Sequence, residues 1–73
     1  MREILKSAVL IDSKGGKHTL NLLRVHGGYT FTWDDIEVDW SFSPRGGYQA
    51  MRHFKGICES VEEVDYMNNW VKG

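Results

Sequence analysis

Four carboxylates lie close together near the middle of the chain, at Asp34, Asp35, Glu37 and Asp39. Alternate residues of a β-strand point to the same side, so Glu37 and Asp39 would stand about 7 Å apart on one face. Carboxylates at that spacing can exchange protons with a substrate or hold a cation. They can also protect an edge strand from further pairing, or meet a basic partner surface. We expect these last two roles, because the strand that carries them would be the last of its sheet.

Other side chains that could do chemistry are too few or too far apart. His18 and His26 lie eight residues apart on one predicted strand, which places them about 26 Å from each other, too far to share an ion. Cys58, the single cysteine, falls on an apolar stripe, where a buried structural thiol is the usual role. No phosphate-binding motif is present. We therefore predict a protein that is not an enzyme, with no metal and no cofactor.

Three pairs of residues predict the hairpin turns that would organise these side chains. Glycine reaches positive φ without steric cost, so Gly15-Gly16 and Gly27-Gly28 predict two-residue loops. At Asp34-Asp35 the apolar residues change from odd to even positions, which predicts a third turn there, with a β-bulge in one long strand as the alternative. The predicted strands cover residues 3–12, 18–26, 29–33 and 36–42.

These turns predict one continuous apolar face. Ile11 would pair with Leu20, and Trp33 with Ile36. Arg24 is the exception on this face, and we expect its guanidinium to reach water across the aromatic rings. The other members of the face are Leu5, Val9, Leu22, Tyr29, Phe31, Val38, Trp40 and Phe42.

The last third of the chain has apolar residues at intervals of three and four, which is helix spacing. Ser43-Pro44 predicts the start of a first helix, with the serine as N-cap and proline in the first turn. Gly56 predicts its end in a left-handed conformation. Ser60 and Glu63 have the spacing of a capping box and predict the start of a second helix.

We therefore predict helices at 46–55 and 61–71, and an α+β fold in which a four-stranded antiparallel meander precedes two short C-terminal helices on one sheet face. Two adjacent glycines weaken the start of the first helix. A fifth strand at 48–54 is thus the alternative, which would leave five strands and one C-terminal helix.

The opposite sheet face would be left open, with an aliphatic patch beside the acidic residues. A contiguous exposed apolar patch is typical of an interaction surface, although a terminus or loop could also cover it. We expect a small protein-binding module that acts as inhibitor, adaptor or accessory factor of a larger protein, and the same patch could serve a homodimer. The predicted partner-binding residues are Asp34, Asp35, Glu37, Asp39, Leu10, Leu23 and Val25.

Nucleic-acid binding is the alternative function. Aromatic rings on a sheet with basic neighbours can stack bases, and the residues that would do so are Arg24, Tyr29, Lys14 and Lys17. It requires that the helices leave the aromatic face open. The net charge of −1 argues against a protein whose main task is to neutralise phosphates.

Length and composition set the remaining expectations. The 73 residues predict one domain, 1–73. A single cysteine suits a reducing compartment, so we expect a cytoplasmic protein. The longest uninterrupted apolar run, 8–11, is far shorter than a membrane span. A complete protein of this size with no catalytic motif would most often bind a larger one.

Overall fold

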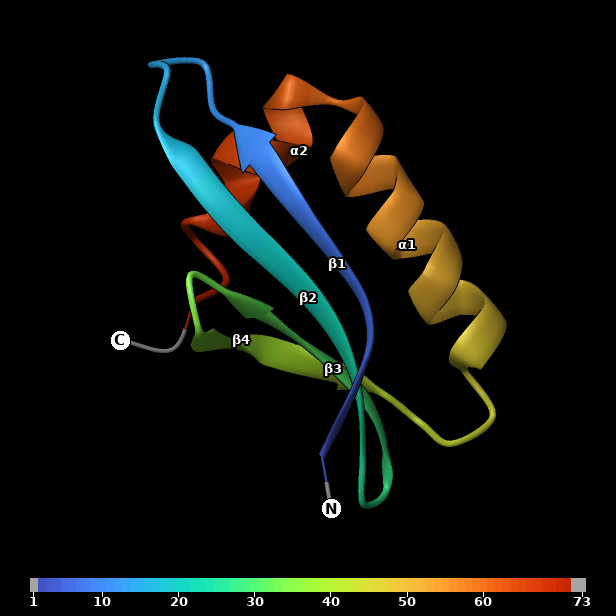
Figure 1. The fold of residues 1–73 in the computed structure, drawn as a ribbon. Coiled ribbons are helices and arrows are strands. Elements are labelled where there is room, and N and C mark those ends of the chain that lie inside the picture. Colours follow the sequence, from blue (N-terminus) through green and yellow to red (C-terminus); the bar gives the residue numbers. More distant parts are fainter. Residues whose placement is uncertain (1, 72–73) are drawn as a thin grey trace.

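The computed structural model describes residues 2–71, in which one antiparallel sheet is followed by two helices (Figure 1). The sheet has the order β1-β2-β3-β4, and the predicted α+β fold is confirmed. The fifth strand considered at 48–54 is absent, because those residues are helical. The elements are β1 (Glu3–Ile11), β2 (Lys17–Val25), β3 (Gly28–Trp33), β4 (Ile36–Phe42), α1 (Gly47–Glu59) and α2 (Val61–Met67).

At two of the three predicted turns, the strands that follow place the predicted side chains on the core face of the sheet. Asp34 and Asp35 form the β3–β4 turn with φ of 54° and 68°, and Trp33 pairs with Ile36 as predicted. The β2–β3 turn lies one residue earlier than predicted, since Val25 pairs with Gly28. This moves the register by two residues, so the same side chains face the core.

The β1–β2 connection differs from the prediction and reverses the faces of β1. Ile11 pairs with Lys17 rather than Leu20, and the loop has five residues, 12–16. The Asp12 carboxylate explains this loop, because its Oδ1 accepts hydrogen bonds from the backbone N–H of Lys14 at 2.9 Å and of Gly16 at 2.8 Å. An Asp side chain that bonds its own following backbone builds a turn without requiring a two-residue loop.

An odd shift in register exchanges the two faces of a strand. Ala8 and Leu10 consequently pack against the hydrophobic core, whereas Val9 and Ile11 are 67% and 49% exposed. A second irregularity, between Ile4 and Lys6, leaves Leu5 outside the regular pairing. The prediction that Leu5, Val9 and Ile11 are buried is therefore wrong.

An irregularity in β4 changes the pairing of its second half. Thr32 pairs with Glu37, but Thr30 pairs with Ser41, so β4 has extra residues opposite β3. Tyr29 consequently pairs with Phe42. The outer edge of β4 is instead bridged by the C-terminal segment 70–71: Val38 pairs with Val71, and the Asp39 N–H donates to the Trp70 carbonyl.

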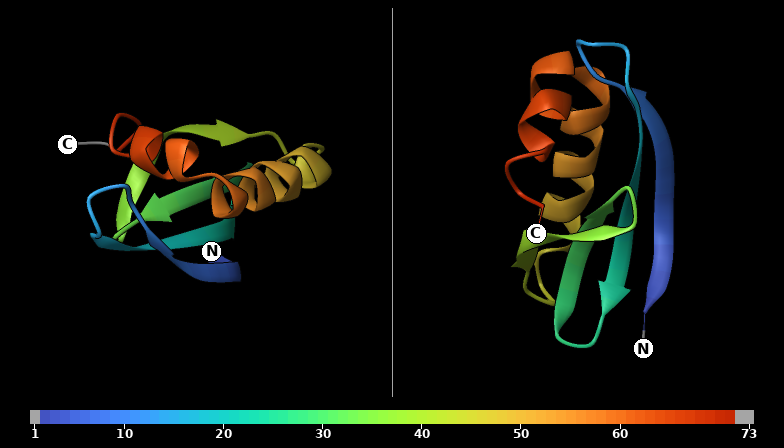
Figure 2. Two further views of the ribbon diagram at one scale, coloured as in Figure 1. Left: turned by 90° about the horizontal axis from the view of Figure 1, so that it is seen from above. Right: turned by 90° about the vertical axis from the view of Figure 1, so that its left-hand side faces the viewer.

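Both helices cover one face of the sheet (Figure 2), and the core lies between the two layers. The largest buried side chains of the sheet are Trp33, Phe31, Leu20 and Leu22. Phe31 stacks on Phe54 of α1 with ring centroids 6.4 Å apart. The aromatic face is thus core, as the helix spacing predicted. The helices contribute Ala50, Phe54, Ile57, Val64 and Met67.

The helix boundaries agree with the prediction at one of four points. The Ser60 Oγ accepts a hydrogen bond from the Glu63 N–H, so α2 begins at the predicted capping box. The start of α1 does not use Ser43, because its N-cap is Gly46, which has no side chain to accept a bond. α1 also continues through Gly56 to Glu59, four residues beyond the end predicted from the glycine, and α2 ends at Met67 rather than 71.

Candidate partner-binding surfaces

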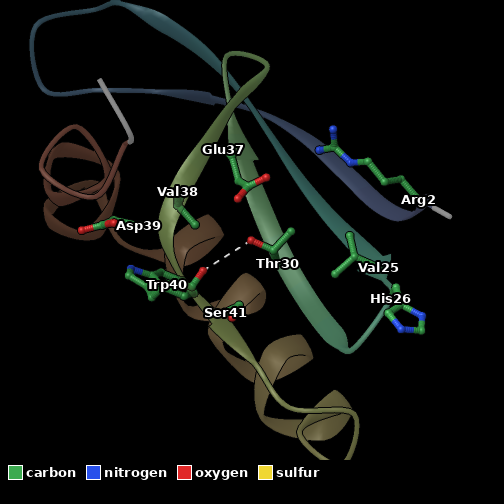
Figure 3. Close-up of a pocket in the computed structure, with 9 residues that line it drawn as sticks. All are labelled: Arg2, Val25, His26, Thr30, Glu37, Val38, Asp39, Trp40 and Ser41. Atoms are coloured by element: carbon green, nitrogen blue, oxygen red, sulfur yellow. Dashed lines mark hydrogen bonds between the residues drawn. The ribbon is translucent and has the colours of Figure 1, made fainter.

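A shallow hollow of about 480 Å³ lies on the open face of the sheet (Figure 3). It brings together three of the predicted partner-binding residues, Val25, Glu37 and Asp39. The Thr30 hydroxyl donates to the Trp40 carbonyl at 3.3 Å across its floor. Arg2 and His26 also line it, so the hollow carries basic as well as acidic side chains and does not select one sign of charge.

The other predicted acids belong to the β3–β4 turn and do not join this hollow. Asp34 is used by the fold: its Oδ1 accepts a hydrogen bond from the Thr19 N–H at 3.0 Å, and its Oδ2 lies 2.6 Å from His18 Nδ1. Asp35 is exposed beside it. The four acids therefore do not form one continuous strip.

His18 joins three segments of the chain through its two ring nitrogens. Nε2 lies 2.7 Å from Asp12 Oδ2, Nδ1 meets Asp34, and the ring stacks on Trp33 with centroids 4.7 Å apart. The hydrogen bonds to Asp12 and then Asp34 raise the pKa of His18, and the His18 hydrogen bond lowers the pKa of Asp12. Both nitrogens face carboxylates, an arrangement that favours the protonated ring and ties the two loops together.

The predicted aliphatic patch does not exist as predicted. Leu10 packs on the helix side of the sheet against the core, as the reversed face of β1 requires. Leu23 lies on the open side but is only 5% exposed, and Val25 is half-buried at the hollow. Leu10 and Leu23 therefore have little surface to offer a partner.

Most of the exposed apolar residues of the sheet lie instead along β1, the exception being Ile36 at the start of β4. Ile4, Val9 and Ile11 are 61%, 67% and 49% exposed. Within residues 2–71, β1 pairs only with β2, so its other edge is open. Sequence reasoning missed this row because the two-residue loop placed Val9 and Ile11 in the core. Asp12, four residues before Gly16, was the signal that could have corrected it, since an Asp side chain can cap such a loop.

A groove of about 890 Å³ separates β1 from α1. Lys6 of β1 faces Arg52 and Lys55 of α1 across it, and Glu59 is the one acid among the lining residues. Arg52 lies over the Tyr48 ring at 5.8 Å from its centroid. The groove is therefore basic, with apolar walls. Its remaining lining residues are Met51, Phe54, Gly56 and Cys58, the thiol of the last having its pKa raised by burial.

The residues predicted for nucleic-acid binding are not brought together. Arg24 forms an ion pair with Glu3 at 2.5 Å, and Tyr29 packs against the core. Lys17 lies at the other end of β2, seven residues from Arg24, which corresponds to about 23 Å along a strand. Lys14 lies in the adjoining loop. No single platform contains all four.

Neither helix in residues 2–71 is long and apolar enough to cross a membrane. In the same part of the chain, no group of three or more His, Cys, Asp or Glu side chains is arranged to hold a metal ion. Comparison with models of protein families, with curated proteins and with solved structures finds no match for this chain.

Proposed function

We propose that this protein is a non-catalytic binding module that takes an extended segment of a larger protein as an added strand along β1, and thereby acts as an inhibitor, adaptor or accessory factor. The observation that carries this proposal is the open edge of a nine-residue strand whose apolar side chains Ile4, Val9 and Ile11 are about half exposed or more. An edge strand presents unpaired N–H and C=O groups that another chain can meet.

The C-terminal half of β1 lacks the features with which proteins usually protect such an edge. Charges, prolines and bulges discourage strand addition, yet the five residues 7–11 include neither a charged residue nor a proline. The irregularity of this strand lies at its other half, near Leu5. The edge of β4, in contrast, carries Glu37 and Asp39 and is bridged by residues 70–71. β1 is therefore the edge on which a partner strand would dock.

The groove between β1 and α1 indicates the chemistry of the partner. A strand added to β1 would run beside Lys6, Arg52 and Lys55, which outnumber Glu59 in this groove. Opposite charges at a binding surface speed association and select the register. The expected partner is therefore an extended segment that alternates apolar and acidic side chains, with the apolar ones toward Val9 and Ile11.

A pair of designed peptides tests this proposal directly. One ten-residue peptide alternates valine and glutamate, and the other alternates valine and lysine. We expect the acidic peptide to protect the backbone amides of β1 from hydrogen exchange while those of α2 are unchanged, and the basic peptide to bind at least about tenfold more weakly. Equal binding of the two peptides, or protection elsewhere on the molecule, would refute the proposed occupant.

Two matched variants distinguish peptide binding at β1 from non-specific binding to exposed apolar residues. Val9→Lys places a charge on the exposed row, whereas Val61→Lys makes the same change at a residue of α2 that is 50% exposed. Only the first should weaken peptide binding. Sedimentation of the protein alone provides the second readout. Self-association that Val9→Lys abolishes would show that a second copy, and not a larger protein, occupies the edge.

A further inference from the structure

An aromatic groove of about 590 Å³ lies between β4 and α2. Trp40 is one of its lining residues, and the Trp70 ring meets the Trp40 ring edge-on, with centroids 5.9 Å apart and planes at 79°. His53 meets Trp40 on another side at 4.9 Å and 87°. Perpendicular rings form a corner in which a ligand can contact the face of one ring and the edge of the next. The other lining residues are Ser41, Phe42, Glu63, Tyr66 and Met67.

Part of this aromatic surface is accessible to a ligand. Tyr66 is 59% exposed and Trp70 is 43% exposed. Both residues therefore keep large ring surfaces outside the core. Exposed aromatic rings around one hollow are typical of binding sites, since Trp and Tyr supply a large rigid contact area.

The charge around the groove favours a cation. Glu63 is the one carboxylate among the lining residues, and neither lysine nor arginine lines the groove in the described part of the chain. The Glu63 carboxylate has no hydrogen-bond or ion-pair partner in residues 2–71. Its backbone N–H, in contrast, donates to the N-cap Ser60. A carboxylate without a partner that lines the same groove as tryptophan and tyrosine rings is a combination that attracts an organic cation.

We infer that this groove binds the ammonium group of a lysine side chain, methylated at Nζ, from another protein chain. Methylation weakens the hydration of the ammonium group and keeps its charge, so the group suits an aromatic wall with a single carboxylate. The groove is open along the surface, so a side chain can enter while its backbone stays outside. It shares no lining residue with the groove beside β1, which makes it a second, separate binding site.

A pair of isosteric probes tests the role of charge. N-acetyl-trimethyllysine amide carries the cation, and N-acetyl-2-amino-7,7-dimethyloctanoic acid amide has the same shape, with a neutral tert-butyl carbon in place of the trimethylammonium nitrogen. In two-dimensional NMR spectra, the first should shift the indole N–H signals of Trp40 and Trp70. Trp33, whose Nε1 donates to Asn68 at 3.0 Å, is the internal reference and should not shift. We expect the cation to bind about 3- to 30-fold more tightly. Affinities within twofold of each other would overturn the inference.

Variants of two neighbouring glutamates show which carboxylate attracts the cationic probe. Glu63→Gln keeps the shape of the groove and the backbone cap of α2, and should weaken binding of the trimethyllysine probe about threefold or more. Glu62→Gln, one residue earlier and outside the groove lining, should leave it unchanged. An equal effect of both variants would assign the attraction to the general acidity of α2 and overturn the site. If tetramethylammonium binds as tightly as the lysine derivative, the ligand is a small free cation, and the inference of a lysine side chain from another protein is overturned.

Discussion

Replacement of Gly56 by alanine tests whether α1 ends at this residue or continues through it. The substitution should stabilise the protein if the helix continues and destabilise it if the helix ends there. The sequence predicts a helix end at Gly56 with the glycine in the left-handed conformation. In the structure α1 continues to Glu59, and Gly56 is absent from the glycines with positive φ. A Cβ added at this position meets no other atom within 4 Å. The substitution therefore changes the backbone preference and adds no collision.

The expected stabilisation follows from helix propensity. Alanine is favoured over glycine in a helix interior by about 0.8–1.0 kcal/mol, since it restricts the unfolded chain. For a domain of this size, about 1 kcal/mol raises the melting temperature by roughly 4–8 °C. If Gly56 held the left-handed conformation, the same change would cost about 1–2 kcal/mol. The two accounts thus differ by about 2–3 kcal/mol.

Urea denaturation followed by circular dichroism, on the wild type and two variants, measures this difference. Gly27→Ala is the matched control, because Gly27 also has no atom within 4 Å of an added Cβ but adopts a φ of +93°. We expect Gly56→Ala to raise the free energy of unfolding and Gly27→Ala to lower it. Destabilisation by both variants would refute the continuous helix and restore the predicted end of α1.

Three further predictions test the turns and the histidine. Asp35→Gly should raise the free energy of unfolding by up to about 1 kcal/mol, because Asp35 has a φ of 68° and glycine adopts it without strain; unchanged or lower stability in urea would contradict the turn. Gly28→Ala should lower the melting temperature more than any other glycine substitution, because its Cβ would lie 1.9 Å from the Phe42 carbonyl oxygen; a loss no larger than that of Gly27→Ala would contradict this close approach. His18 has a raised pKa, so its stabilising contribution is complete below the unfolded value of about 6.5 and is lost as pH rises through the folded value. Asp12 has a lowered pKa, so its contribution is lost as pH falls below the unfolded value of about 3.8. Urea denaturation from pH 4 to 9 should show this decline at the alkaline side in the wild type and a smaller slope in His18→Gln, and equal slopes would show that the ring makes no such contribution.

The sequence predicts the fold class and most of β2, β3 and β4, because two independent features specify these strands. Alternating apolar residues specify their faces, and the tight turn at Asp34-Asp35 specifies the pairing of Trp33 with Ile36. A shift of two residues at the β2–β3 turn still leaves the faces unchanged. Such errors do not alter the core.

β1 could not be predicted in the same way, because its outer edge has no neighbouring strand to confirm its register. Its residues Ala8, Val9, Leu10 and Ile11 are apolar on both faces, so the periodicity does not distinguish them. The Asp12 carboxylate decides the register through its bonds to the loop backbone. The predicted binding residue Leu10 consequently packs against the core.

The bridge between β4 and residues 70–71 determines how far copies of this protein can associate. A sheet with two available edges can be extended from chain to chain without limit, as in fibrils. Here the chain itself occupies one edge at Val38 and Asp39. If two copies paired through β1, each would present only this blocked edge to a third. Growth beyond that dimer would require a third copy to displace residues 70–71 from β4, so this short bridge would oppose polymerisation despite the exposed apolar row of β1.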